Sequence, residues 1–336
     1  MTLRGRADTF WAAMRIFRHY NGLPDVARGS VVAIGNFDGV HRGHLAVIGE
    51  AGRIARSANV PWSVLTFEPH PRSVFAPESD SFRLTPFRAK ARLIASLGVD
   101  NLIVLRFDRA FSRLTAETFI ADVLVAGLRA RHVVSGYDFV FGHSRKGNSE
   151  LLLREGADAG FDFTALAPAT DAGGDVHSAT RVRMCLIDGD ARGAARILGR
   201  AFEIEGRVGH GEKRGQTIGY PTANLSLDGY LRPATGVYAV HAGLCADGDR
   251  GEPDRWYDGV ANLGRRPTFA GNDLVLEAHL FAFQGTLYGR RLRVAFIERL
   301  REEKKFDGIT QLKAQIAEDC ARAAEILARR DIGPPV

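Results

Sequence analysis

The sequence lacks the features that mark secreted, membrane-spanning and zinc-binding proteins. Its three cysteines, Cys185, Cys245 and Cys320, lie far apart without a CxxC pair, which argues against a disulfide framework and against a zinc site. No apolar run approaches the ~20 residues that a membrane-spanning helix needs. Residues 1–20 do not contain the uninterrupted apolar core of a signal peptide. We therefore expect a cytoplasmic protein with no membrane partner.

Charge of one sign is not concentrated anywhere in the chain. The formal net charge is +6, but lysine and arginine are scattered instead of gathered in one block. This pattern is typical of a solvated surface, so we expect no nucleic-acid partner, although the positive balance suits anionic small ligands. No segment indicates an obligate protein partner. The chain has 336 residues, of which 45% are hydrophobic and 25% charged, so it is expected to be a soluble protein of two domains.

Strand-like and helix-like segments alternate in the first half of the chain. Strands are expected at 31–34, 61–67, 101–107, 132–137 and 161–167, with helices between them at 45–58, 86–97, 115–128 and 148–159. This alternation predicts right-handed βαβ crossovers and a parallel sheet covered on both faces, a Rossmann-like α/β domain that we place at residues 14–190. Ligands of such sheets bind beyond the carboxyl ends of the strands, where residues 35–44 are expected to lie.

The second half has a different character. Glycine is dense over residues 206–219, and short β-rich runs follow at 236–244, 256–261, 274–283 and 291–297. Short strands with Gly and Pro turns predict a mostly antiparallel β-barrel that is closed or nearly closed. An amphipathic helix over 309–329 ends this domain, which we place at residues 191–330. The boundary is set in the mostly helical stretch 178–198, which breaks near residue 190.

The stretch IGNFDGVHRGH, residues 34–44, contains the first candidate site. An apolar run ends at Gly35, and His41 and His44 follow three residues apart at the expected start of a helix. A metal site would need a third ligand nearby, and the HExxH pattern is absent. A glycine-rich turn before a helix N-terminus attracts phosphate, and two imidazoles there can donate hydrogen bonds to an α-phosphate during in-line displacement. Two surface histidines at a helix start are the plain alternative.

The segment GNFDGVHRGH resembles the signature of the HxGH nucleotidyltransferases, and among them the FMN adenylyltransferase module of bacterial bifunctional riboflavin kinase/FAD synthetases. Three further stretches are similar to that module in the same order, namely TFEPHP (66–71), RLTPFRAK (83–90) and GYDFVFGHSRKGN (136–148). The resemblance implies catalytic roles for His41 and His44. It implies ligand-binding roles for Gly35, Asn36, Phe37, Asp38 and Asp138.

The stretch HSATRVR, residues 177–183, is similar to the second ATP-phosphate motif of that family, in which hydroxyls and an arginine usually meet the β- and γ-phosphates. Ser178, Thr180 and Arg183 match, whereas Ala179 stands where the family usually has a second serine. One potential hydrogen bond to ATP is therefore missing, and the arginine is kept. Taken alone, the cluster would also fit a helix N-cap, and Ser178 can serve both purposes.

The glycine-rich stretch GRVGHGEKRGQTIGYPTAN, residues 206–224, contains neither GxGxxG nor GxxxxGK[ST]. Its glycines, together with Lys213 and Arg214, suit a flap that closes over phosphates, and a plain flexible hairpin is the alternative. The segment PTAN resembles the core motif of riboflavin kinases. That resemblance implies that Thr222 and Asn224 hold Mg²⁺ and ATP, and that Gly215 lies at the nucleotide.

Four later stretches are also similar to riboflavin kinases, namely GVANLGRRPTF (259–269), LEAHLF (276–281), LYG (287–289) and LREEKKF (300–306). Glu277 matches the proposed base of that family, although by itself a strand carboxylate is more often a solvated side chain. The resemblance spans about residues 14–325, and residues 1–13 fall outside it.

The resemblance implies a bifunctional transferase of flavin biosynthesis with riboflavin, FMN, FAD and ATP as ligands. In the kinase step the nucleophile is a hydroxyl that carries a proton, so a carboxylate such as Glu277 is useful. In the adenylyl step the nucleophile is the FMN phosphate, whose second pKa near ~6 makes a base unnecessary. Mg²⁺ is implied in both steps. Two alternatives stay open: a monofunctional riboflavin kinase or FMN adenylyltransferase with one decayed half, and a non-catalytic flavin-binding protein.

Overall fold

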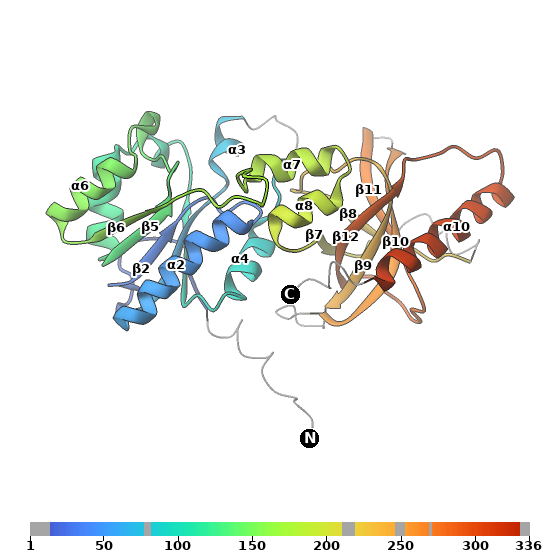
Figure 1. Ribbon diagram of the computed structural model, residues 1–336, viewed down its shortest axis with the longest axis horizontal. Helices are drawn as coiled ribbons and strands as arrows, with labels where there is room; N and C mark the ends of the chain where they lie inside the picture. The colour runs from blue at the N-terminus through green and yellow to red at the C-terminus, as the bar shows by residue number, and fades with distance from the viewer. Residues whose placement is uncertain (1–13, 77–81, 210–218, 246–252, 269–270, 330–336) are drawn as a thin grey trace, which may run out of the picture. The chain divides into compact units, whose positions relative to one another are not determined.

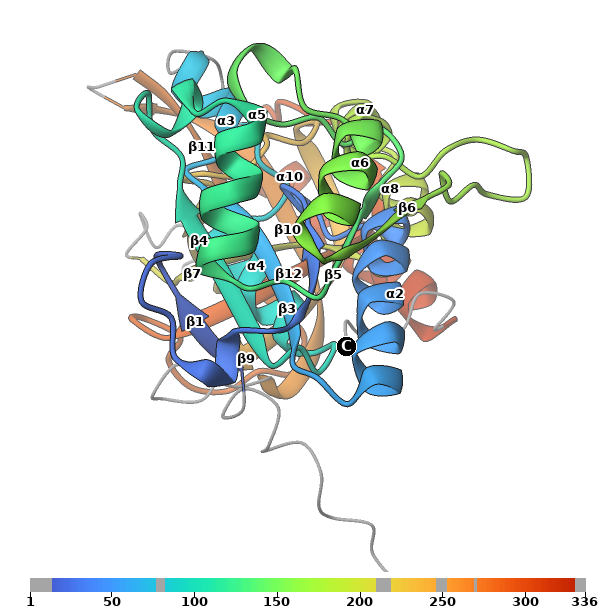
Figure 2. The ribbon, with the colours of Figure 1, turned by 90° about the vertical axis from the view of Figure 1, so that its left-hand side faces the viewer.

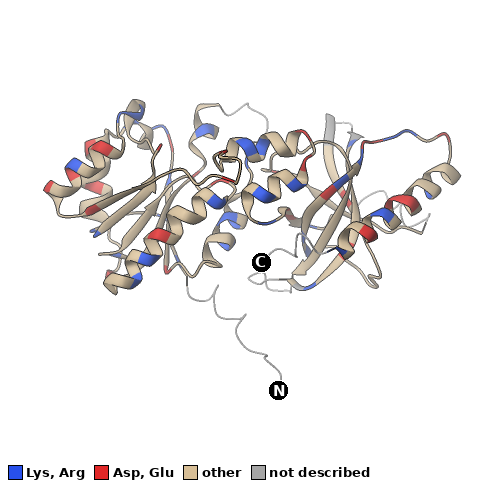
Figure 3. Ribbon diagram, viewed as in Figure 1, with Lys and Arg blue, Asp and Glu red and all other residues tan. Residues whose placement is uncertain are grey.

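The computed structural model describes residues 14–76, 82–209, 219–245, 253–268 and 271–329. The chain forms two compact units (Figure 1). The first unit extends to residue 80 and resumes at Thr85–Ser178, and the second consists of Ser81–Leu84 and Ala179–Val336. Both units contain Lys and Arg residues as well as Asp and Glu residues (Figure 3).

Six parallel strands form the sheet of the first unit, in the order β1-β4-β3-β2-β5-β6. The strands are β1 (Arg15–Phe17), β2 (Val31–Ile34), β3 (Trp62–Glu68), β4 (Asn101–Arg106), β5 (His132–Gly136) and β6 (Asp162–Leu166). Every residue of β2 is buried, as expected for the central strand of a sheet that is covered on both faces. The strand order reverses between β2 and β5, and ligands of such sheets bind at that reversal.

Helices cover both faces of this sheet. The helices α2 (Arg42–Ala58) and α4 (Phe87–Ala95) pack on one face, and the other face carries α6 (Ser149–Ala159) and the π-helical segment η3 (Phe119–Gly127), which continues α5 (Ala116–Thr118). Figure 2 looks onto this unit, with α2 and the α5–η3 helix on different sides. The remaining short elements are η1 (Asp25–Ala27), α3 (Pro71–Phe75), η2 (Phe111–Arg113) and η4 (His143–Arg145). The predicted Rossmann-like domain is confirmed.

Six antiparallel strands form the sheet of the second unit, in the order β7-β12-β9-β10-β11-β8. They are β7 (Phe202–Arg207), β8 (Ala223–Ser226), β9 (Gly236–Cys245), β10 (Pro253–Thr268), β11 (Gly271–Leu280) and β12 (Arg291–Arg301). The two edge strands meet where the Gly209 N–H donates to the Asn224 carbonyl oxygen at 2.9 Å. The sheet is therefore a nearly closed barrel, which confirms the predicted architecture.

The helix α7 (Ala179–Ile187) belongs to the second unit, so the units divide at Ser178/Ala179, whereas the sequence placed the boundary at residue 190. Val182 and Leu186 are 0% and 2% exposed, and they pack in the barrel core beside α8 (Ala191–Leu198). The break near residue 190 is a turn between two helices of one core, where the Asp190 carboxylate caps α8 by accepting from the Gly193 N–H at 2.7 Å. Leu84 is fully buried in the same core.

The C-terminal helix α10 (Ile309–Ala328) packs on the outer wall of the barrel. Ala323, Ile326 and Leu327 are buried there, while Ile309 in the first turn is 58% exposed. The Arg301 guanidinium donates to the Asp319 carboxylate at 2.7 and 2.9 Å and joins the helix to β12. Among the helices in the described ranges, none combines the length and the apolar character needed to cross a membrane.

Candidate active sites

The turn after β2 has an unusual backbone. Phe37 and Val40 have φ angles of 49° and 43°, and Gly39 has 85°. Non-glycine residues seldom adopt this region, at a cost on the order of 1–3 kcal/mol each, unless the surroundings enforce it. Both Phe37 and Val40 are 1% exposed, so packing in the core holds them. Strained backbone of this kind is typical of functional sites.

The two histidines lie at the start of α2, directly after this turn. His41 is the N-cap residue, and its Nδ1 accepts from the His44 N–H at 3.4 Å. The two imidazole rings stack with centroids 3.6 Å apart and an interplanar angle of 24°. The Phe37 ring meets His44 edge-on at 5.3 Å. The three-residue spacing therefore places both imidazoles together at the helix N-terminus, where backbone N–H groups favour an anion.

Gly43, between the histidines, is a residue for which the sequence analysis gave no role. A Cβ atom at this position would lie 3.1 Å from the His177 carbonyl oxygen and 3.1 Å from the His41 ring. Both contacts are tighter than ordinary van der Waals packing. Glycine is thus what allows the 177–178 segment to pass close to the helix start.

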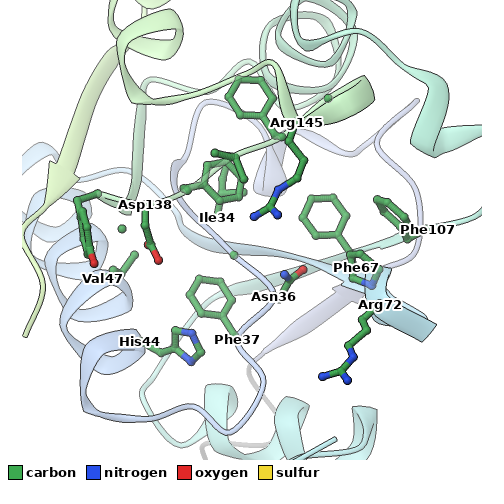
Figure 4. A pocket seen from close by; sticks show the side chains of 18 of the residues that line it. Ile34, Asn36, Phe37, His44, Val47, Phe67, Arg72, Phe107, Asp138 and Arg145 are labelled. Carbon is green, nitrogen blue, oxygen red and sulfur yellow. The ribbon is translucent and has the colours of Figure 1, made fainter. Parts of the chain in front are cut away.

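A cavity of about 1140 Å³ opens at the carboxyl ends of the strands in the first unit. Figure 4 shows side chains that reach it from the turn after β2, from α2 and from the segment after β5. Its lining includes six of the residues that the sequence predicted as ligand-binding or catalytic: Gly35, Asn36, Phe37, His44, Asp138 and Ser178. The volume is sufficient for a nucleotide and a second organic ligand.

One wall of this cavity is aromatic, which the sequence analysis did not foresee. Phe67 lies 6.0 Å from Phe107 and 5.9 Å from Phe111, centroid to centroid. Arginines also line the cavity, namely Arg72, Arg109, Arg113 and Arg145. Aromatic faces can stack on a flat heterocycle, and guanidinium groups bind phosphate. The available signal was the presence of phenylalanine at or just after the ends of β3 and β4.

Asp38 is held by hydrogen bonds within the first unit, and its predicted role in ligand binding stays a prediction. It is 2% exposed, and its Oδ1 accepts from the Thr85 N–H at 3.0 Å. The Thr85 Oγ1 in turn accepts from the Gly39 N–H at 2.9 Å. In this structure the Asp38 carboxylate therefore joins the turn to the segment before α4.

The HSATRVR motif is divided between the two units. Ser178 ends the first unit, and Thr180 and Arg183 lie on α7 in the second. The Arg183 Nε donates to the Phe82 carbonyl oxygen at 2.8 Å, and its guanidinium lies over the Phe82 ring at 5.5 Å. Part of this side chain thus serves packing within the second unit. The role predicted for Thr180 and Arg183 at the ATP phosphates stays a prediction.

In the second unit, a row of polar residues crosses three strands. Glu277 on β11 pairs with Asn224 on β8 and with Asn262 on β10. Their strand neighbours Leu225, Leu263 and Leu276 are buried in the barrel core. Because successive side chains of a strand point to opposite faces, the three polar residues share the outer face. Asn262 was not predicted, although it lies in the GVANLGRRPTF motif.

His279 lies two residues after Glu277 and contacts the segment that carries Thr222. Its Nδ1 is 2.9 Å from the Pro221 carbonyl oxygen, and the Tyr220 ring meets it edge-on at 5.4 Å. The predicted residues Thr222, Asn224 and Glu277 are therefore brought to one region of the barrel wall. Gly215, Lys213 and Arg214 of the predicted flap lie outside the described residues.

No group of three or more His, Cys, Asp or Glu side chains that could hold a metal ion is present in the described part of the chain. Thr222, Asn224 and Glu277 nevertheless offer hydroxyl, amide and carboxylate oxygens, which are the donors that Mg²⁺ prefers. These donors would fit Mg²⁺ held together with the phosphate oxygens of a nucleotide, and this role of Thr222 and Asn224 stays a prediction.

Comparisons with known proteins assign a different family description to each half. Residues 23–180 match the family model for FAD synthetase, and residues 198–327 match the one for riboflavin kinase. A bifunctional riboflavin kinase/FMN adenylyltransferase of Escherichia coli (strain K12) is 42% identical over 93% of this chain and 97% of that protein. The protein of the same description from Bacillus subtilis (strain 168) is 38% identical over 86% of this chain and 90% of its own length.

A solved structure is also similar over nearly the whole chain. It is a crystal structure from Streptococcus pneumoniae described as a macrolide-efflux protein, with a TM-score of 0.79 and 32% sequence identity. The match covers 91% of this chain and 97% of that one. Both units described above therefore occur together, in the same order, in another protein.

Proposed function

The chain belongs to the family of bifunctional riboflavin kinases/FMN adenylyltransferases, and we propose that it carries out both reactions of that family. It phosphorylates riboflavin to FMN with ATP, and it adenylylates FMN to FAD with release of pyrophosphate. The observation that supports this proposal is that each unit has candidate reactive side chains of its own. The histidine pair lies in the first unit, and Glu277 with Asn224 lies in the second. A decayed half is therefore not favoured.

The first unit is proposed to adenylylate FMN. The phosphate oxygen of FMN attacks the α-phosphorus of ATP, the bond to the β-phosphate oxygen breaks, and pyrophosphate leaves. The N–H groups at the start of α2 and the imidazole of His44 stabilise the charge that develops on the α-phosphate. The aromatic wall around Phe67 and Phe107 supports stacking of the flavin ring, and the cavity arginines suit the phosphates of both substrates.

The second unit is proposed to phosphorylate riboflavin. Glu277 accepts the proton of the ribityl 5′-hydroxyl as its oxygen attacks the γ-phosphorus of ATP, and ADP leaves. Asn224 faces Glu277 across the β8–β11 strand pair. The backbone hydrogen bonds of this pair therefore fix the position of Asn224, which would hold the nucleotide, relative to Glu277, which takes the proton. Thr222 and Asn224 would hold Mg²⁺ together with the ATP phosphates. Mg²⁺ neutralises triphosphate charge when it is bound.

One assay tests the proposed function. Purified protein is incubated with riboflavin, ATP and Mg²⁺, and FMN and FAD are separated by chromatography over time. FMN should appear first and FAD should follow, and EDTA should stop both. Accumulation of FMN without FAD, or conversion of supplied FMN without conversion of riboflavin, would show that only one unit is active.

A cytoplasmic location, predicted from the sparse cysteines, is part of the same proposal.

A further inference from the structure

The RLTPFRAK motif, residues 83–90, contains two buried polar residues that neither reaction uses directly. Lys90 is 0% exposed and Thr85 is 5% exposed. A lysine is almost never fully buried unless its ammonium group is paired, because removing the charge from water is costly. The position of these two side chains therefore calls for an explanation beyond the filling of a core.

Lys90 is connected to the turn after β2 through two hydrogen bonds in series. Its Nζ lies 2.9 Å from the Glu68 Oε1 and 3.4 Å from the Thr66 Oγ1, at the end of β3. The Thr66 hydroxyl donates to the Asn36 carbonyl oxygen at 3.1 Å. Since Asn36 lines the cavity, the buried ammonium group is linked to the backbone of the candidate site.

Thr85 contacts the same turn two residues further on. Its N–H donates to the Asp38 carboxylate at 3.0 Å, and its Oγ1 accepts from the Gly39 N–H at 2.9 Å. Lys90 supports Asn36 through Thr66, and Thr85 binds Asp38. Phe37, with its positive φ, lies between these two residues. The two supports therefore lie on either side of Phe37, and Val40, the second non-glycine residue with a positive φ, directly follows Gly39.

We propose that Thr85 and Lys90 are positioning residues for adenylylation, which hold the strained turn 35–41 so that its N–H groups and His44 meet the α-phosphate. This rests on the proposed function of the first unit. A turn of this kind persists only when its surroundings fix it, and a small displacement of groups that stabilise a transition state lowers the rate sharply. A purely structural role is the competing explanation, because a buried ion pair can often be replaced by apolar residues without loss of stability.

Four variants separate the two explanations. Lys90→Met keeps the length of the side chain and removes the charge, and Glu68→Gln/Lys90→Met removes both charges so that no lone carboxylate stays buried. Thr85→Val removes the hydroxyl and keeps the β-branch, whereas Thr85→Ser keeps the hydroxyl. For each, kcat and KM of FAD formation from FMN and ATP are measured well below the midpoint of thermal unfolding. Riboflavin phosphorylation by the same samples reports on the second unit.

The double variant should unfold near the wild-type temperature but form FAD about 10- to 100-fold more slowly, mainly through kcat. Thr85→Val should lose about tenfold in kcat, and Thr85→Ser should recover most of that loss. Riboflavin phosphorylation should stay at the wild-type rate throughout. Wild-type kcat in both the double variant and Thr85→Val would overturn the proposal, as would a loss that only follows the fraction of unfolded protein. His44→Ala is run alongside: if it keeps full FAD formation, the proposed site itself fails, independently of Thr85 and Lys90.

Discussion

Asn224 and Glu277 stand directly opposite each other across the β8–β11 strand pair. Side chains in such a pair have Cβ atoms about 4.5–5.5 Å apart, so the amide and the carboxylate are within reach of one small ligand group. Asn262 flanks Glu277 on the other side, from β10. The carboxylate is therefore carried by an inner strand of the barrel wall instead of a loop, which favours a fixed position for a general base.

Glu277→Gln should lower riboflavin phosphorylation by ~10²–10⁴, because the amide keeps the shape of the side chain and cannot accept the proton. FAD formation from supplied FMN should be unchanged, since that nucleophile is already ionised and its site lies in the other unit. Both rates are measured on the same purified sample. If FAD formation from FMN also disappears in a folded variant, the assignment of two separate sites is wrong.

His44→Ala should lower adenylylation by ~10²–10³, because a donor at the developing charge is lost. FMN should then accumulate when riboflavin is the substrate.

His41 needs a matched pair of variants, because it is also the N-cap of α2. His41→Asn keeps a capping side chain and His41→Ala does not, and loss of a cap costs about 1 kcal/mol. Equal loss of FAD formation in both would indicate a chemical role, whereas recovery in His41→Asn would indicate a structural one.

Gly43→Ala should reduce FAD formation even though alanine favours helix. The added Cβ would lie 3.1 Å from the His177 carbonyl oxygen and from the His41 ring, so the histidine pair or the 177–178 segment must shift. Gly49→Ala is the control, because it lies on the same helix with no heavy atom within 4 Å of the new Cβ. It should keep activity and raise stability by about 1 kcal/mol. Similar activity of both variants would show that the close approach at Gly43 is unimportant.

The stability of the first unit should depend on pH through His132. Partial burial lowers the pKa of this imidazole from its ordinary value of 6.5, against the smaller opposing effects of Asp162 and Glu50. The unfolded chain therefore takes up the proton first as the pH falls. The stabilisation is complete above pH 6.5 and declines as the pH drops from there toward the folded-state pKa.

His132→Gln should remove this dependence. Unfolding temperatures of wild type and variant are compared from about pH 7.5 to about pH 5, since the unperturbed pKa of histidine falls inside that interval. The difference in unfolding temperature between wild type and variant should shrink, or change sign, toward the acidic end of the interval. A constant difference over the whole interval would contradict the prediction.

Hydrophobic periodicity predicted the longer elements to within a few residues. The strand expected at 31–34 is β2, and the helix expected at 148–159 is α6 at Ser149–Ala159. The strands β1, β7 and β8 were missed. Three or four residues, as in β1 and β8, carry no readable period, whereas β7 was missed although Phe202 and Ile204 alternate with Glu203 and Glu205. The strand β10 extends over Pro253–Thr268, well beyond the predicted 256–261, since charged residues such as Arg255 and Arg265 interrupt the apolar pattern of its sequence.

Local motifs predicted the candidate sites better than they predicted the residues that support them. His41, His44 and Asn36 are close in sequence, so one glycine-rich turn was enough to place them together. Thr85 contacts that turn from 47 positions further along the chain, and Lys90 is linked to it only through Thr66, which is 24 positions away. Such contacts depend on how β3 and α4 pack, which a single sequence does not encode as a visible pattern. The aromatic wall was missed for the same reason.

Leu84 is synthesised long before the strands whose core it completes. It lies in the first half of the chain, yet it is fully buried with the barrel residues of the second unit. Domains tend to fold in the order in which they leave the ribosome. The first unit can therefore fold before the barrel residues that contact Leu84 have been synthesised. The barrel reaches its final packing only when this side chain, from an early part of the chain, enters its core. Separating the two halves into independent polypeptides would therefore leave a leucine-sized hole in the second one.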